Sequence, residues 1–168
     1  MVAIVLNACQ SNEIPQFDAG NIKDKPEQSV SNIEVNFVDS TFRKATLFAD
    51  SAFVYNEHNY TMLRQNIKVL FYSKENHKLI STLTADSVRI EDRSKDMIAY
   101  GNVVVKTDAP SSTILETSEL LWNNIERKIY TKSFVKITSP NEVLQGYGFE
   151  SDDKLSYYKI YKVIGEQK

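Results

Sequence analysis

From residue 33 onward, apolar and polar side chains alternate with a period of two instead of the 3.6 of an amphipathic helix. Val35 and Phe37 fall on one face of the chain, for example, and Asn36 falls on the other. Polar clusters that suit hairpin loops interrupt this alternation at residues 72–76, 91–96 and 107–110. The pattern predicts an antiparallel all-β domain.

Three stretches of the chain repeat the same order of residue types. Each begins with a small or acidic triplet, continues with two apolar residues at alternate positions, and leads through a polar stretch to an alternating strand. The triplets lie at 49–51, 85–87 and 117–119, and the strands at 66–69, 102–105 and 134–137, so both are spaced by 36 and then 32 residues. A repeated strand pair cannot bury its apolar face alone, so we expect the units to stack around one continuous inner face.

A change of parity marks one position within this pattern. Ile98 and Tyr100 alternate in one phase, and Val103 and Val105 alternate in the other. Gly101 lies between the two pairs, which predicts a β-bulge or tight turn there.

Length, composition and charge indicate a single globular domain and argue against a nucleic-acid-binding protein. The 168 residues suit one domain, and 42% hydrophobic residues are ordinary for a globular chain. The formal net charge of −2 provides no basic surface for nucleic acid, so we expect no nucleic-acid partner.

The first nine residues form an apolar run that ends at Cys9, the only cysteine. As a helix the run would span roughly 12 Å, too short for a bilayer core of about 30 Å. Leu6-Asn7-Ala8-Cys9 instead resembles a bacterial lipobox, so we predict that residues 1–9 are a signal remnant, that the natural start lies upstream of Met1, and that Cys9 is lipidated. The alternative is an N-terminal strand with a buried free thiol.

The segment from 10 to 31 is polar and has almost no apolar periodicity; it includes Pro15 and Pro26. This composition predicts a flexible tether, followed by a β domain at residues 32–165.

Residues that could carry catalysis or bind a metal are scattered. His58 and His77 fall in expected loops without a second ligand at metal spacing. Glu91, Asp92 and Asp96, like Asp152-Asp153, are best interpreted as charged hairpin tips, and Gly146-Tyr147-Gly148 as a bend between strands. We therefore expect no enzyme activity, no metal and no cofactor.

The order of several short motifs resembles the LptC family of lipopolysaccharide-export proteins and its OstA-like relatives. The likeness covers roughly residues 33–165, but typical members have an N-terminal transmembrane helix where this chain has Cys9. The motifs are Val69-Leu70-Phe71-Tyr72, Leu83-Thr84-Ala85-Asp86, Tyr100-Gly101-Asn102-Val103-Val104-Val105, Leu115-Glu116-Thr117-Ser118-Glu119-Leu120-Leu121-Trp122 and Gly146-Tyr147-Gly148-Phe149-Glu150-Ser151-Asp152.

The resemblance implies a single folded-over antiparallel sheet, the OstA-like β-jellyroll, with lipid acyl chains in its interior. It also implies a periplasmic protein anchored at the inner membrane, which passes lipopolysaccharide from an ABC transporter to an LptA-like bridge protein. The inner-face residues that recur at matching places are the predicted lipid contacts, although each could equally be an ordinary core residue: Val69, Phe71, Val88, Ile90, Val103, Val105, Leu120, Trp122, Val135 and Ile137.

The last apolar stretch, residues 155–164, is expected to be an edge strand, because no repeat follows it. An edge of this composition could dock the next protein by strand addition. The predicted docking residues are Leu155, Tyr157, Tyr158, Ile160 and Tyr161. The alternative is an ordinary last strand that the N-terminal segment covers. If a chain truncated from Leu155 onward still bound its partner, the docking edge would lie elsewhere, near residues 33–38.

The sequence is also compatible with two other functions. One is a structural or adhesive envelope β-lipoprotein with a closed, packed core. The other is an enzyme of envelope metabolism on a β scaffold, against which the missing acid–base or metal cluster argues.

Overall fold

The computed structural model describes residues 25–108 and 112–167, which form one β-sheet and a single short 3₁₀ turn at Asn56–His58. The nine strands are β1 (Gln28–Asp39), β2 (Phe42–Tyr55), β3 (Tyr60–Tyr72), β4 (Leu79–Glu91), β5 (Met97–Thr107), β6 (Ile114–Asn123), β7 (Lys128–Thr138), β8 (Val143–Asp152) and β9 (Tyr158–Gln167). The prediction of an all-β fold is confirmed.

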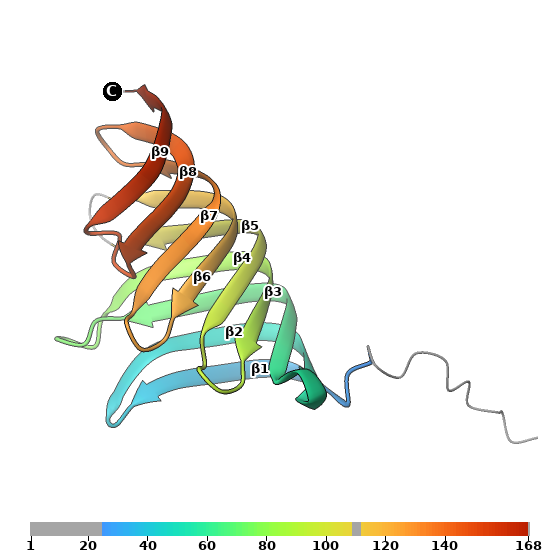
Figure 1. Ribbon diagram of the computed structural model, residues 1–168. Helices are drawn as coiled ribbons and strands as arrows, with labels where there is room; N and C mark the ends of the chain where they lie inside the picture. The colour runs from blue at the N-terminus through green and yellow to red at the C-terminus, as the bar shows by residue number, and fades with distance from the viewer. Residues whose placement is uncertain (1–24, 109–111, 168) are drawn as a thin grey trace, which may run out of the picture.

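Each strand pairs in antiparallel register with the next strand of the chain, so the order in the sheet is the order in the sequence (Figure 1). β1 has only β2 as a neighbour, and β9 has only β8. The sheet does not close, and its two free edges lie at opposite ends of the molecule. β1 does not pair with β9, so β1 does not cover the last strand, and the alternative in which the N-terminal segment does so is wrong for this part of the chain.

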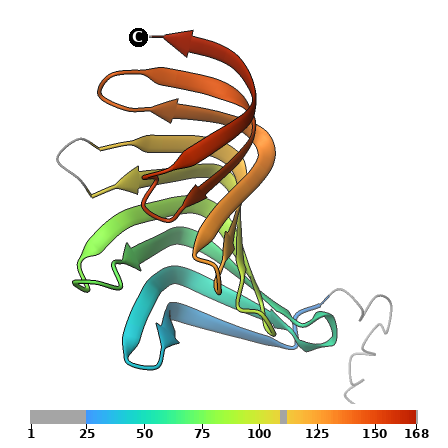
Figure 2. The same cartoon turned by 60° about the vertical axis from the view of Figure 1, so that its left-hand side comes forward.

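The sheet folds over along a line that crosses the middle of its strands (Figure 2). At this line, which we call the crease, the pairing register shifts in each strand pair from β2–β3 to β7–β8. Bulges bend a strand and increase its twist. The crease therefore divides the sheet into two walls that face each other.

The repeated sequence triplets lie on the crease. Gly101 has a φ of +71°, and an added Cβ would lie 2.2 Å from the Asp86 carboxylate on β4. Asn66 and Asn102 also have positive φ, at 52° and 44°. Asparagine and glycine tolerate this backbone region best, so these residues allow the bend, and the predicted bulge at Gly101 is confirmed.

The hairpin turns form two rows, which we call rims. The first rim holds the turns that join β1–β2, β3–β4, β5–β6 and β7–β8; the second rim holds the turns that join β2–β3, β4–β5, β6–β7 and β8–β9. The half of the sheet between the crease and the first rim is the first wall, and the half between the crease and the second rim is the second wall. Because the walls face each other, the two rims border a common opening, which we call the mouth.

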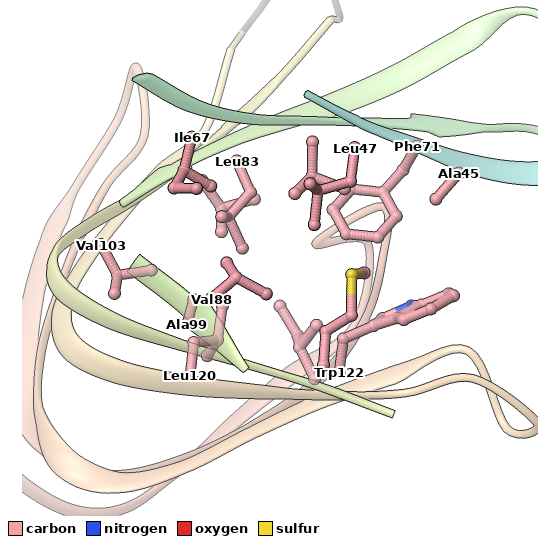
Figure 3. Close-up of a cluster of buried hydrophobic side chains, with 14 of the residues drawn as sticks. Ala45, Leu47, Ile67, Phe71, Leu83, Val88, Ala99, Val103, Leu120 and Trp122 are labelled. Atoms are coloured by element: carbon pink, nitrogen blue, oxygen red, sulfur yellow. The ribbon is translucent and has the colours of Figure 1, made fainter. Parts of the chain in front are cut away.

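The apolar core lies between the two walls (Figure 3). Alternating strand residues point inward from both sides, as the sequence pattern predicts. Figure 3 shows Ala45, Leu47, Ile67, Phe71 and Leu83 of the first wall opposite Val88, Ala99, Leu120 and Trp122 of the second.

Three predicted boundaries need correction. β1 begins at Gln28, so residues 28–31 belong to the sheet and not to the tether. The last strand is Tyr158–Gln167 instead of 155–164, and Leu155 lies in the β8–β9 turn with only 5% of its surface exposed. Residues 146–148 lie within β8, where Gly148 has a φ of +73°, so they bend one strand and do not separate two.

Candidate functional site

The ten inner-face residues selected from the sequence all point into the space between the walls. Four lie on the second wall, and the remaining six lie on the first. Ile90 is the most exposed of the ten at 6%, and the other nine are at most 2% exposed. The prediction that they share one inner face is confirmed, whereas contact with a lipid stays a prediction.

Trp122 lies near the second-rim end of β6 and joins the two walls. Its ring meets Phe37 of β1 edge-on, with centroids 5.4 Å apart, and lies 5.5 Å from the ring of Phe71 on β3. The indole Nε1 is buried and has no hydrogen-bond partner among the described residues. Trp122 is the only tryptophan of the chain, so it is a natural fluorescent reporter of the interior.

The apolar interior reaches the surface beside the β1 edge. A groove of 370 Å³ lies between the end of β1 and the second rim, and Ile90 connects it to the inner face. Its lining is largely apolar on the β1 side and polar on the rim side: Val35, Asn36, Phe37, Val38, Thr61, Ile90, Asp92, Lys95 and Asn124.

The mouth is bridged by a polar cluster around Arg127, in the β6–β7 turn of the second rim. Arg127 Nη2 donates to the carbonyl oxygen of Tyr72 on the first rim at 2.7 Å, and its guanidinium lies 5.2 Å from the centre of the Phe42 ring. On its own rim, Arg127 forms an ion pair with Asp153. Ser81, near the start of β4 on the first rim, donates to the carbonyl oxygen of Asp153 at 2.6 Å.

Asp153 is nearly inaccessible to water, with 4% of its side chain exposed. Burial raises the pKa of the Asp153 carboxyl above its usual range, and the neighbouring Arg127 guanidinium opposes that rise. The interpretation of Asp152-Asp153 as a solvated hairpin tip is therefore wrong for Asp153. Its partners are distant in sequence, so no local motif marked it or Arg127 as a bridging residue.

Two further polar contacts cross the mouth. Lys44 of β2 donates from Nζ to the backbone oxygen of Asn124 at 3.0 Å and to its Oδ1 at 3.3 Å. Tyr158, at the start of β9, donates to Glu142 Oε1 beside the β7–β8 turn at 3.0 Å. The rims therefore meet at several points from β2 to β9.

The β9 edge combines inward-facing and exposed apolar side chains. Tyr158 and Ile160 pack partly against the core, while Tyr161, Val163 and Ile164 are 59%, 55% and 55% exposed. Of the five predicted docking residues, Tyr158, Ile160 and Tyr161 lie on this edge strand. Leu155 and Tyr157 lie in the preceding turn, where Leu155 is buried and Tyr157 is exposed.

The titratable residues considered as metal ligands do not converge. Across residues 25–108 and 112–167, no three side chains of His, Cys, Asp or Glu are placed to share a metal ion. His58 stacks beside Tyr60, and His77 meets Phe42 edge-on. Cys9 lies outside the described residues.

Comparison with known proteins agrees with this architecture. A family model described as "Lipopolysaccharide-assembly, LptC-related" matches residues 1–164. The fold is similar to the crystal structure of LptH from Pseudomonas aeruginosa, an LptA-homologous periplasmic component of the lipopolysaccharide transport device. The TM-score is 0.55 at 12% identity, over 70% of this chain and 82% of LptH. No characterised protein matches in sequence, and the described residues include no helix of the length and hydropathy that a membrane span requires.

Proposed function

Since this chain belongs to the LptC-related family of lipopolysaccharide-assembly proteins, we propose that it transports lipopolysaccharide without catalysis, by holding lipid A acyl chains against its inner face. Lipopolysaccharide transport is the general role of the family, and the mode of binding is our proposal. The observation that carries it is the continuous apolar inner face, which runs from β1 to β9 without an interruption by charge.

The energetics favour an acyl chain in such an interior. Each CH₂ group of an acyl chain is stabilised by about 0.8 kcal/mol relative to water, both in a membrane and in an apolar interior, so burial between the walls offsets the cost of taking the chain out of the bilayer. The inner-face side chains already cover one another, so the two walls must separate for a chain to lie between them. The groove beside β1 is the place where Ile90 and Phe37 give access to the interior.

Docking to the next protein is proposed to occur at β9. An unpaired edge strand offers main-chain donors and acceptors to a strand of a second sheet. Addition of an LptA-like bridge protein there would extend both the sheet and its apolar inner face. By the same reasoning, β1 is proposed to face the inner-membrane ABC transporter.

The docking proposal can be tested with matched substitutions on the two edges. Val163 on β9 and Val30 on β1 are similarly exposed, at 55% and 50%. Val163→Lys should weaken capture of the LptA-like protein of the same organism, and Val30→Lys should leave it unchanged. The opposite result would place the bridge protein at β1.

Membrane attachment is proposed to use a lipid on Cys9, with the domain in the periplasm. The lipobox-like sequence that ends at Cys9 supports this proposal. Cys9→Ser should release the protein from the membrane fraction into the soluble periplasmic fraction. Unchanged membrane fractionation of this variant would rule the lipid anchor out.

Site-specific photocrosslinking tests lipid binding directly. A photoreactive residue at Val105, Leu120 or Ile137 should crosslink to lipopolysaccharide, because all three lie on the inner face. The same residue at Lys68 or Lys136 should not, because both lie between inward-facing neighbours and point away from the core. Equal crosslinking from both sets would contradict binding between the walls.

A structural envelope β-lipoprotein with a packed core is the second candidate, because the inner-face residues are almost fully buried against one another. Purification from the membrane of the native organism separates the two functions. A transport protein should carry lipopolysaccharide at close to one molecule per chain, whereas a packed structural protein should carry none.

A further inference from the structure

The cross-mouth contacts bear on how a glycolipid moves through the proposed site. A lipopolysaccharide molecule joins apolar chains to a large polar headgroup. The headgroup cannot cross an apolar interior, because burying polar groups without partners is costly. With the chains between the walls and the headgroup in water, the linkage between them has to pass through the mouth.

The mouth of this structure is closed along that route. Arg127 and Asp153 of the second rim hold Tyr72 and Ser81 of the first rim through hydrogen bonds of 2.7 and 2.6 Å. Lys44 closes the neighbouring position by its bond to Asn124. The contacts involve β2, β3 and β4 on one side and the β6–β7 and β8–β9 turns on the other.

We propose that Arg127, Asp153 and Lys44 form a polar clasp across the mouth, and that this clasp must open for the headgroup linkage of a lipopolysaccharide to pass. This inference rests on the proposed binding of acyl chains between the walls. The clasp residues control passage by joining the rims and need not contact the acyl chains.

The chemistry of the clasp suits repeated opening. The Arg127–Asp153 pair is largely buried, and a buried ion pair loses much of its attraction to desolvation. The pair lies within the second rim and stays intact when the rims separate. Water then hydrates both charges again, which offsets part of the cost of the lost hydrogen bonds to Tyr72 and Ser81. An apolar seam of the same extent would expose hydrocarbon to water on opening, which is unfavourable throughout.

The partners of the clasp make it releasable without loss of the fold. Tyr72, Ser81 and Asn124 accept or donate through groups that water can also satisfy. The sheet itself is held by main-chain ladders that do not cross the mouth. Opening the clasp therefore leaves the strand pairing intact and changes only the distance between the rims.

A reversible covalent lock tests the proposal. In a Cys9→Ser background, Ser81→Cys with Asp153→Cys places two thiols where the rims touch. The control pair, Lys68→Cys with Thr84→Cys, joins neighbouring strands β3 and β4 away from the mouth. Mass spectrometry confirms each disulfide, and lipopolysaccharide binding is measured before and after reduction.

The locked protein should bind lipopolysaccharide at least about tenfold more weakly than its reduced form, while the control pair binds equally in both forms. Equal binding by the locked and reduced proteins would overturn the clasp and leave the proposed function standing. If the reduced proteins and the wild type all fail to bind, the proposed function itself fails.

A distance measurement covers the case in which the lock disturbs folding. Spin labels at Lys78 and Ile125 report the separation of the two rims, because both residues are exposed in turns on opposite sides of the mouth. Lipopolysaccharide should lengthen this distance, and Arg127→Gln should lengthen it without lipid. An unchanged distance in lipopolysaccharide-bound wild-type protein would contradict the proposal.

Discussion

Asn102 of β5 donates its side-chain amide to the Asp86 carboxylate of β4 at 2.9 Å, across the crease of the sheet. The equivalent bond joins Asn66 to Asp50 at 2.6 Å. These two residues lie 36 positions before Asn102 and Asp86 in the chain. Each asparagine has a positive φ, so the bond fixes a backbone bend that would otherwise be strained. The sequence repeat therefore encodes the line along which the sheet folds.

Substitution of Gly101 should damage this bend. In Gly101→Ala, the added methyl group meets the Asp86 carboxylate, and the positive φ is unfavourable for alanine. We expect a loss of about 2 to 3 kcal/mol in the free energy of unfolding, measured by chemical denaturation.

Gly165→Ala is the matched control, because its added Cβ would have its nearest neighbours at 3.9 Å. This variant should stay within about 0.5 kcal/mol of the wild type. Equal losses at the two glycines would mean that the crease does not depend on Gly101.

The fold was accessible from the sequence because two signals coincide in it. Alternation identified the ten inner-face residues, since a strand buried on one face has a period of two. The repeated triplets mark the position of the crease in the sequence. Only the structure shows that they lie within strands and that the strands bend there. Residues 28–31 were missed because this part of an edge strand is exposed and lacks alternation.

The clasp was not accessible in the same way. Arg127 and Asp153 lie in turns 26 residues apart, and their first-rim partners are more than 40 residues away from either. An Asp-Asp pair in a turn ordinarily indicates a solvated tip, and only the meeting of the rims buries Asp153. The predicted start of the last strand at Leu155 was wrong for a related reason. In sequence, an apolar residue in a buried turn resembles the first residue of a strand.

Truncation of a side chain on the inner face should lower the free energy of unfolding much more than truncation of an exposed side chain on the β9 edge. Ile137→Ala removes a fully buried side chain from between the walls and should cost about 3 kcal/mol of unfolding free energy. Ile164→Ala makes the same chemical change at a residue that is 55% exposed, and should cost about 0.5 kcal/mol or less. Similar losses at both positions, measured by urea denaturation, would argue against a core between the walls.

The stability of Arg127→Gln should depend on pH. Without the guanidinium, the buried Asp153 carboxylate loses its cation, and we expect a loss of about 3 kcal/mol at neutral pH. Burial already raises the pKa of Asp153 in the folded protein above its unfolded value of about 3.9. The carboxyl group therefore contributes most to the free energy of unfolding below that unfolded pKa. This contribution is lost as the pH rises through the pKa of the folded state. Removal of Arg127 raises this pKa further, so the loss should shrink as the pH falls.

The exposed Arg93 supplies the control for this series. Arg93→Gln should change the unfolding free energy by about 0.5 kcal/mol or less at any pH. A loss in Arg127→Gln that is the same at acid and neutral pH would show that Asp153 does not sense the guanidinium.

The central claim is that acyl chains lie between the two walls, and quenching of Trp122 fluorescence tests it most directly. Bromine atoms quench tryptophan only at close range, and Trp122 is the single tryptophan of the chain, 1% exposed between the walls near the second rim. We predict that a dibrominated fatty acid quenches Trp122 to saturation, and that unlabelled lipopolysaccharide restores the emission. Unquenched emission with the brominated fatty acid bound would contradict the account.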